Sequence, residues 1–429
     1  MHTVKKINEA KYYLKTDNPD IYDRLSGHFA ARPEGYHFMP AYKMGAWDGY
    51  NRFFSGGFFA SGLLSELKTK LDGVEVSFNE GIDVDFKDFQ KFVESLKIPL
   101  NVRDYQIQAA YDACKNQKIA IHLPTSSGKS LVQYIITRFL LSGNKKALII
   151  VPIINLVEQL FKDFVSYGWS DASDYVYKIY GGQKFNVDYP VTISTWQSIS
   201  KKTDFSVFNA LMIDEAHLAK GKSISTIGSS CVNAEWRIGL SGTFPEPNTS
   251  DWFSIVGTLG PIKSYANYES LRELGYLANL EIININLDYE KSMREIAYEY
   301  CYKNYQAEVD YLIGIKQRNE FLAKLATNFK DNVLVLFTRK KHGKILHDMI
   351  KEKGKKVHYI DGGVDTEDRE IIRQILEVEE GTKFLEFADI KIQLDFYDEV
   401  PLKNGTIKLA KNITLEDDVC EKWIEKYKY

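Results

Sequence analysis

Residues 118–130 read KIAIHLPTSSGKS, an apolar segment that runs into a loop of small residues. A helical pattern follows at residues 131–136. Backbone N–H groups of such a loop can surround phosphate oxygens, and the helix N-terminus adds the positive end of its dipole. Lys129 could then reach the β- and γ-phosphates of a nucleotide, and Ser130 could bind Mg²⁺. The complete phosphate-loop pattern has glycine where this chain has Leu123, so an ordinary helix-capping loop is the alternative.

Apolar segments alternate with helical patterns on either side of this loop. Strands are expected at residues 118–123, 147–151, 191–194, 210–213 and 237–240, and helices at 131–136 and 156–164. All-apolar strands that alternate with helices predict a parallel sheet covered on both faces. Ligands of such sheets bind at the carboxyl ends of the strands. We therefore expect an α/β fold with its site at that edge.

Two adjacent carboxylates follow the expected strand at 210–213, in the sequence Asp214-Glu215-Ala216-His217. Asp214 could hold Mg²⁺, and Glu215 could orient and deprotonate an attacking water. An acidic pair after a strand is also common where a helix begins, because it complements the helix dipole. The phosphate loop in the same sheet favours the nucleotide-binding interpretation.

Two further segments are weaker signals when each is taken alone. Ser241-Gly242-Thr243 follows another strand, and its hydroxyls could link a nucleotide to movement of the lobe or simply cap a helix. Gln106, close to Arg103, precedes the phosphate loop. A glutamine amide both donates and accepts, which suits the edge of adenine, although most such residues are merely solvated.

In this order, these segments resemble the motifs of superfamily 2 helicases and translocases, in which two RecA-like lobes close on ATP and step along nucleic acid. The matches are Gln106 (Q motif), 124–130 (motif I), 151–159 (motif Ia), 214–217 (motif II, DEAH type) and 241–243 (motif III). The resemblance implies catalytic roles for Lys129, Asp214 and Glu215; ATP contacts by Arg103, Gln106, Thr125, Ser126, Ser127, Gly128, Lys129 and Ser130; Mg²⁺ ligation by Ser130 and Asp214; and coupling by His217, Ser241 and Thr243.

Within that superfamily, residues of about 15–378 are similar to the recombination helicases of T-even bacteriophages. Gly35 to Phe54 with its Trp47-Asp48-Gly49 resembles their small DNA-binding domain. The resemblance implies an ATP-dependent DNA helicase that acts on branched DNA in recombination, repair and fork processing, in the host cytoplasm. The DNA contacts that we expect are Lys43, Trp47, Arg52, Thr195 and Trp196. The motor subunit of a restriction system shares the core motifs, but the Trp47-Asp48-Gly49 segment argues against it.

Residue composition and sequence pattern divide the chain into four regions. Glycine-separated aromatic runs in residues 1–95 indicate a small α+β DNA-binding domain. We expect a RecA-like lobe at 96–265, then a helical connector with a truncated second RecA-like lobe at 266–380. Residues 381–429 read as a β-rich tail unlike the family, with a hairpin at 400–409 around Asn404-Gly405.

The second lobe departs from the family pattern. Motif VI, which reads like Gln-x-x-Gly-Arg-x-x-Arg and brings arginine to the γ-phosphate, is absent. Arg373 is the last arginine, and residues 374–429 hold eight lysines against thirteen acidic residues. We therefore expect an incomplete or split motor, with a second chain that supplies motifs V and VI. The alternative is a branched-DNA-binding module without ATPase activity of its own.

Composition limits the remaining classes. The 429 residues are 44% hydrophobic, which excludes a disordered chain, and the net charge of −3 means that any DNA site is a local patch. No apolar run reaches the length of about 18 residues that a membrane span needs. The four cysteines have neither disulfide-framework nor metal-ligand spacing, which fits a reducing cytoplasm.

Overall fold

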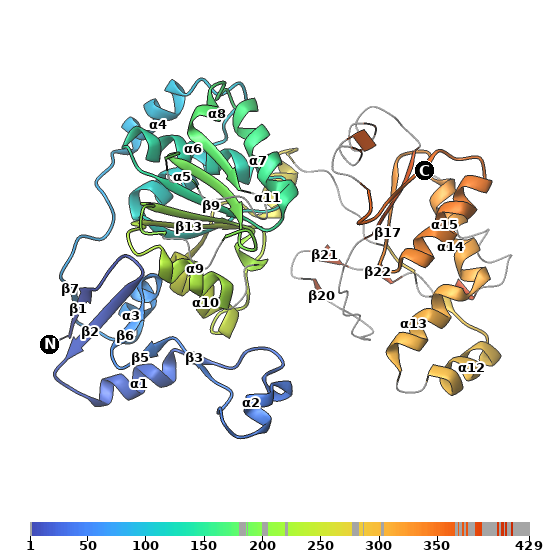
Figure 1. Ribbon diagram of the computed structural model, residues 1–429, viewed down its shortest axis with the longest axis horizontal. Coiled ribbons are helices and arrows are strands. Elements are labelled where there is room, and N and C mark those ends of the chain that lie inside the picture. The colour runs from blue at the N-terminus through green and yellow to red at the C-terminus, as the bar shows by residue number, and fades with distance from the viewer. Residues whose placement is uncertain are drawn as a thin grey trace. The chain divides into compact units, whose positions relative to one another are not determined.

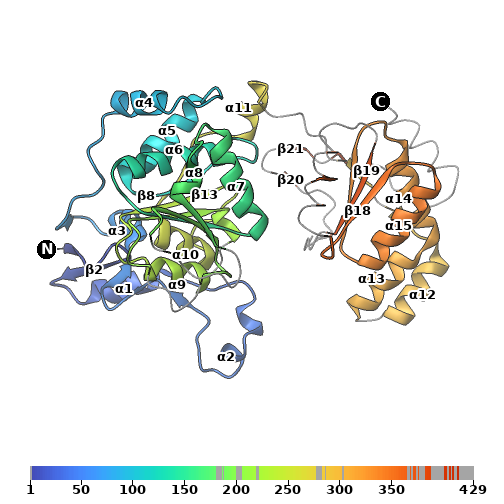
Figure 2. The same ribbon diagram turned by 45° about the horizontal axis from the view of Figure 1, so that its top comes forward.

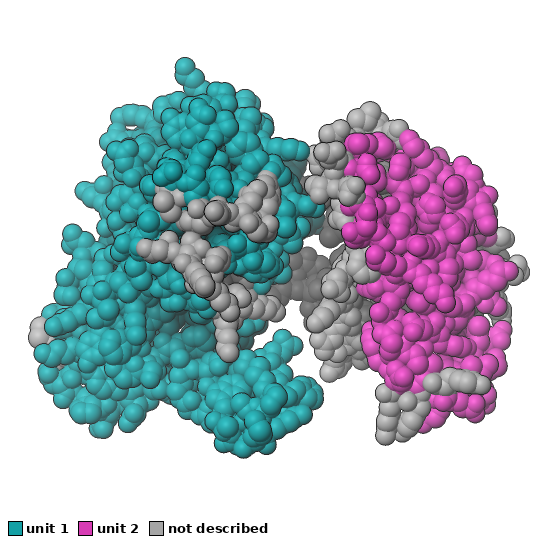
Figure 3. All heavy atoms as spheres, in the orientation of Figure 1, with its two compact units in different colours: residues 1–279 teal, residues 280–429 magenta. Residues whose placement is uncertain are grey.

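The computed structural model describes residues 2–179, 186, 188–199, 205–218, 222–276, 283–285, 287–301, 304–364, 368, 371–372, 375, 382–387, 401–402, 405–406, 408–409 and 413–414. The chain forms two compact units, residues 1–279 and 280–429, which Figure 3 colours separately. Each unit is described by itself.

The first unit contains a seven-stranded sheet in the order β10-β11-β9-β12-β13-β8-β14, in which every neighbouring pair is parallel. Its strands are β8 (Lys118–His122), β9 (Ala147–Val151), β10 (Val176–Ile179), β11 (Val191–Thr195), β12 (Ala210–Asp214), β13 (Trp236–Ser241) and β14 (Ile262–Ser264). Every strand expected from the sequence in this region is present, so the α/β prediction is confirmed.

Helices cover both faces of this sheet (Figures 1 and 2). They are α5 (Asp104–Asn116), α6 (Lys129–Ser142), α7 (Ile154–Ser166), α8 (Ala172–Tyr175), α9 (Lys222–Ser230) and α10 (Ser250–Leu259). Successive strand residues point to opposite faces. In β9, for example, Ile149 lies in the core formed with α5, α6 and α7, whereas Leu148 and Ile150 lie in a second core that includes Ile255 of α10.

The N-terminal domain is a five-stranded sheet in the order β5-β6-β2-β1-β7. Its elements are β1 (His2–Lys6), β2 (Lys11–Thr16), α1 (Asp20–His28), β5 (Phe54–Ser55), β6 (Phe58–Ala60), η2 (Ser61–Leu63), α3 (Leu64–Lys70) and β7 (Val74–Val76). The next helix, α4 (Phe86–Ser95), buries Phe89 and Val93 in the core of the seven-stranded lobe. The core of the N-terminal domain includes Trp252, Phe253 and Val256 of α10. The domain therefore shares buried surface with the seven-stranded lobe.

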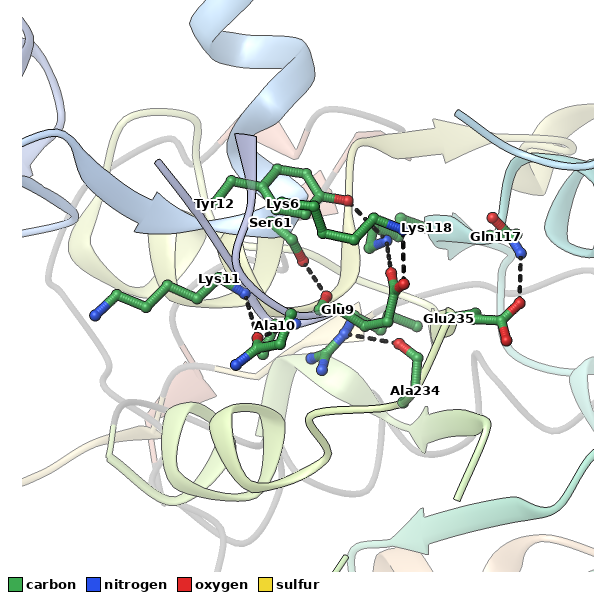
Figure 4. Close-up of polar contacts among 12 residues, drawn as sticks. Lys6, Glu9, Ala10, Lys11, Tyr12, Ser61, Gln117, Lys118, Ala234 and Glu235 are labelled. Atoms are coloured by element: carbon green, nitrogen blue, oxygen red, sulfur yellow. Dashed lines mark hydrogen bonds and ion pairs between the residues drawn. The ribbon is translucent and has the colours of Figure 1, made fainter. Parts of the chain in front are cut away.

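Polar contacts fix the same junction (Figure 4). The Glu9 carboxylate pairs with Lys6 at 2.7 Å and with Lys118, the first residue of β8, at 3.0 Å. The Lys118 ammonium also donates to the Tyr12 hydroxyl at 3.1 Å. Because β8 leads directly into the phosphate loop, the N-terminal domain is anchored to the strand that carries that loop.

An arm, residues 32–50, extends from the N-terminal domain. β3 (Ala30–Ala31) pairs antiparallel with β4 (Asn51–Arg52) and closes its base. Its far end holds η1 (Tyr36–Phe38) and α2 (Pro40–Lys43). Figures 1 and 2 both show α2 lying away from the five-stranded sheet.

The second unit is built on a three-stranded parallel sheet in the order β17-β19-β18. Its elements are α12 (Lys291–Cys301), α13 (Tyr305–Gly314), α14 (Lys316–Asn328), β17 (Val333–Phe337), α15 (Lys340–Glu352), β18 (Val357–Ile360) and β19 (Lys383–Phe387). β19 lies between the other two strands, so this sheet extends past the boundary that we expected at residue 380.

Among the described residues of the second unit, short strands beyond β19 form three two-stranded pairs. β20 (Pro401–Leu402) pairs antiparallel with β21 (Gly405–Thr406), which is the hairpin expected from the sequence, although Asn404 lies outside the described residues. β22 (Lys408–Leu409) pairs with β15 (Ile283–Asn284), and β23 (Ile413–Thr414) with β16 (Leu287–Asp288). In the described part of the chain, none of the helices has the length and apolar character needed to cross a membrane.

Candidate active site

The phosphate loop connects β8 to α6 and adopts a conformation that requires glycine at one position. Gly128, the N-cap of α6, has φ of 83°, and a Cβ there would lie 2.3 Å from Nε2 of Gln106. Ser126 has φ of 63°. The Ser127 hydroxyl is buried and donates to the Pro124 carbonyl at 2.6 Å. These contacts hold the loop closely, while Thr125 and Ser126 are exposed.

Gln106 braces this loop. Its amide nitrogen donates to the Ser127 carbonyl at 2.8 Å, and its amide oxygen accepts from the Arg103 backbone N–H at 2.9 Å. Tyr105 also donates to the Ser127 carbonyl, at 2.7 Å, and receives a hydrogen bond from the Arg103 guanidinium at 2.8 Å. The structure thus brings Arg103 and Gln106 to the phosphate loop. It also identifies Tyr105, which the sequence reasoning passed over.

Glu215 lies at the carboxyl end of β12 and faces Lys129 of the phosphate loop. Its Oε1 is 3.3 Å from the Lys129 Nζ, and its Oε2 is 3.3 Å from Nδ1 of His217. Its φ of 45° is unusual for a residue with a Cβ and typical of functional positions. The hydrogen bond from His217 and the charge of Lys129 hold the pKa of Glu215 below its usual value, although burial opposes this. Glu215 is therefore an anion at neutral pH.

Asp214 has the opposite electrostatic environment. Burial, followed by the negative charge of Glu215, raises the pKa of Asp214 to about 6. The Gln133 amide nitrogen, from α6, donates to Oδ1 of Asp214 at 2.9 Å. Gln133 is 1% exposed, and Ser130 lies one helical turn before it on the same helix. A buried glutamine among the apolar residues of α6 was an available signal that the sequence reasoning missed.

A hydrogen-bonded path leads from Glu215 to the segment 241–243. His217 Nδ1 lies 2.7 Å from the Ser241 hydroxyl, which itself donates to the Thr243 carbonyl at 2.6 Å. The hydroxyl oxygen can then accept, so we assign the His217 proton to Nδ1. Leu123 N donates to the Ser241 carbonyl at 3.0 Å, which places this segment beside the phosphate loop. Lys129, Glu215, His217 and Ser241 are therefore one connected network.

The five residues expected to contact DNA lie on two separate elements. Lys43, Trp47 and Arg52 belong to the arm and its base. The Trp47 indole N–H donates to the Tyr50 carbonyl at 2.9 Å, and the Arg52 guanidinium pairs with Asp48. Thr195 is 1% exposed, and its hydroxyl lies 2.9 Å from the Ser198 hydroxyl. Trp196 packs against the second core of the lobe, which includes Ile255 of α10. Only Lys43 combines exposure with a charge that no described carboxylate pairs.

A parallel sheet with a phosphate loop after one strand and an Asp-Glu pair after another defines the nucleoside-triphosphate-hydrolysing lobe of a helicase-type motor. Residues 99–246 match the family model of the type III restriction enzyme, res subunit. The chain is 34% identical over 384 residues to the ATP-dependent DNA helicase uvsW of Enterobacteria phage T4, a match that covers 83% of this chain and 74% of the relative.

Solved structures agree with that relation. The crystal structure of T4 UvsW covers 90% of this chain and 80% of its own, with a TM-score of 0.57 and 29% identity. A second crystal structure of the bacteriophage T4 UvsW helicase covers 61% of this chain and 99% of its own, with the same TM-score and 30% identity. The chain therefore belongs to the UvsW family of superfamily 2 helicases, and it is a nucleic-acid-binding enzyme that uses ATP.

Proposed function

We propose that this protein is a Mg²⁺- and ATP-dependent DNA helicase that acts on branched DNA in phage recombination, repair and fork processing, in the host cytoplasm. The observation that carries the proposal is the network that joins Lys129, Glu215, His217 and Ser241. It links the residue expected at the phosphates to the residue expected to activate water, and then to the segment expected to transmit movement. The UvsW relation supports the choice of DNA as the substrate.

The Lys129–Glu215 ion pair weakens Glu215 as a base. The Lys129 ammonium stabilises the Glu215 carboxylate and helps to hold its pKa below the usual value. Triphosphate oxygens would compete for the same ammonium. The Glu215 carboxylate would then keep His217 as a partner and turn its freed oxygen toward water. We infer that binding of ATP itself activates the general base.

Asp214 and Ser130 are the residues that we expect to hold Mg²⁺. The cation prefers oxygen ligands, and a carboxylate whose charge is destabilised by burial gains most from a nearby positive charge. The hydrogen bond from Gln133 fixes the orientation of the Asp214 carboxylate. When bound, the cation would neutralise charge on the transferring phosphoryl group.

Two parts of the proposal lie outside this site. Lys43, Trp47, Arg52, Thr195 and Trp196 are proposed to contribute to the DNA path. Arg373 is the last arginine and no run resembling motif VI is present, so we propose that a second chain supplies motifs V and VI and that this chain alone turns ATP over slowly. The match to the restriction-subunit family runs from the segment of Gln106 to the segment 241–243, which both kinds of motor share, so it does not favour a restriction motor over a helicase.

Glu215→Gln tests the assignment of the base. We expect ATP still to bind but its hydrolysis to fall by about a hundredfold or more, as for loss of a general base. Glu235→Gln is the matched control, because Glu235 also pairs with a lysine, Lys145, at 3.2 Å and is similarly exposed, but it precedes β13 at the opposite edge of the sheet. Wild-type turnover by Glu215→Gln would show that Glu215 is not the base.

A further inference from the structure

The arm (residues 32–50) is held by contacts among its own side chains. The Arg32 guanidinium lies 4.6 Å from the ring centroids of both Tyr36 and Tyr50, and it donates to the Tyr36 hydroxyl at 2.9 Å. The ring of Tyr42 meets that of Tyr36 edge-on at 4.9 Å. Gly49 lies against these rings, and a Cβ there would come within 2.9 Å of Tyr36. These contacts stiffen the arm without using the side chains of Phe38 or Met44.

The end of the arm presents bare apolar side chains to solvent. Phe38 is 70% exposed and Met44 is 74% exposed. Two large apolar side chains that are this exposed on one short projecting segment are typical of an interaction site, whereas a single exposed apolar residue is common on any surface. We call Phe38 and Met44, with Lys43 between them in sequence, the tip.

The tip is electrostatically suited to a polyanion. Residues 35–47 contain Lys43 and His37 and no carboxylate. The Lys43 Nζ lies over the Phe38 ring, 5.8 Å from its centroid, and the centroids of the His37 and Phe38 rings are 4.1 Å apart, so a base that reaches Phe38 meets a cation close to the ring. Among the described residues, no carboxylate pairs with this ammonium. A base with its phosphate fits this combination of a flat ring and an adjacent cation.

We propose that the tip is a wedge, in which Phe38 and Met44 stack against the first unpaired base at a DNA branch point and Lys43 contacts its phosphate. This proposal rests on the proposed function and adds the residues that recognise the branch. Phenylalanine and methionine are among the side chains that insert between base steps. Stacking tolerates any sequence, as a branch-recognising protein requires. A stiff support favours stacking, since little side-chain freedom is then lost on binding.

A protein partner fits the tip less well. Stable protein interfaces bury roughly 800 Å² on each partner. Two side chains at the end of a narrow arm provide only a small part of such an area, whereas a single stacked base needs no more than an aromatic face.

The test compares the affinity of the full-length protein for forked DNA with its affinity for an unbranched duplex of equal length, without ATP. We expect the double variant Phe38→Ala/Met44→Ala to lower the preference for the fork about tenfold, the effect of losing one stacked base. Phe38→Trp should retain the preference. Lys43→Ala should weaken binding to the fork more than binding to the duplex, and it should lower the salt dependence of fork binding.

Phe58→Ala is the matched control. Phe58 is 41% exposed in the same domain, and the Lys11 Nζ lies 4.4 Å from its ring centroid, but it lies on β6 rather than on the arm. We expect its fork preference to equal that of the wild type. A second readout is 2-aminopurine placed at the branch, whose fluorescence should rise on binding of the wild type and of Phe58→Ala, but not of the tip double variant.

The outcomes separate this proposal from the proposed function. If the wild type prefers forks and the tip double variant prefers them equally, the wedge is wrong and DNA-directed motor activity is unaffected. If the wild type hydrolyses ATP but shows no preference for forks, recognition of branches by the tip is likewise wrong. If the wild type binds neither DNA, the proposed function fails together with the wedge.

Discussion

Asp214 is a carboxyl group placed where its charged form is unfavourable. Its pKa of about 6 lies above the ordinary value of 3.8 because the group is buried beside Glu215. The folded state therefore binds this proton more tightly than the unfolded state does. The contribution of Asp214 to the stability of the fold is then unfavourable above pH 6 and disappears below about pH 4.

Asp214→Asn should therefore stabilise the fold while it abolishes ATP hydrolysis. A shift of about two pKa units corresponds to roughly 3 kcal/mol at pH 7, and asparagine keeps the acceptor that Gln133 uses. Thermal unfolding of Asp214→Asn and of the wild type at pH 7 and at pH 4 measures this. We expect the unfolding midpoint of the variant to exceed that of the wild type at pH 7 and to equal it at pH 4. Asp48→Asn is the control, because Asp48 is exposed and its hydrogen bond to Arg52 lowers its pKa to about 2. A lower midpoint for Asp214→Asn than for the wild type at pH 7 would contradict the account.

At the scale of the element, α6 is flanked by two glycines, Gly128 at its N-cap and Gly143 at its C-cap, and their surroundings differ. Gly128→Ala places a methyl group 2.3 Å from Nε2 of Gln106 in a left-handed backbone, so the brace on the phosphate loop must break. We expect ATP affinity to fall by about tenfold or more, since strain of this kind amounts to 1–3 kcal/mol. Gly143→Ala at the other end of α6 meets no atom closer than 3.5 Å and should bind ATP normally. Equal affinities, measured by titration with a fluorescent ATP analogue, would mean that the brace is unimportant.

Five of the seven strands of the first lobe were predictable because they are mainly apolar runs. β9, for example, begins and ends where the sequence indicates. The two edge strands, β10 (VYKI) and β14 (IKS), were not expected, because each is short and carries a lysine. β19 was assigned to a separate tail because its parallel partners, β17 and β18, lie 46 and 23 or more residues away in sequence and leave no local signal. Site residues in motif segments could be proposed from the sequence. Gln133 and Tyr105 were not, because their roles depend on which helix faces which loop.

At the scale of the whole molecule, we assign both ATP binding and the recognition of DNA structure to this one chain. The N-terminal domain shares its core with α10, and Glu9 anchors it to the strand that enters the phosphate loop. DNA held by that domain is thus connected by packed elements to the nucleotide site. We expect the rate of ATP hydrolysis to depend on the DNA that is bound.

The most direct test is ATP turnover by the purified protein, measured with no DNA, with an unbranched duplex and with a forked duplex, beside Lys129→Ala as the blank. The account predicts that forked DNA raises the turnover of the wild type above both other conditions, and that Lys129→Ala shows no turnover in any of them. Turnover by the wild type that is absent, or that is the same with and without DNA, would contradict the assignment of a DNA-driven motor to this chain.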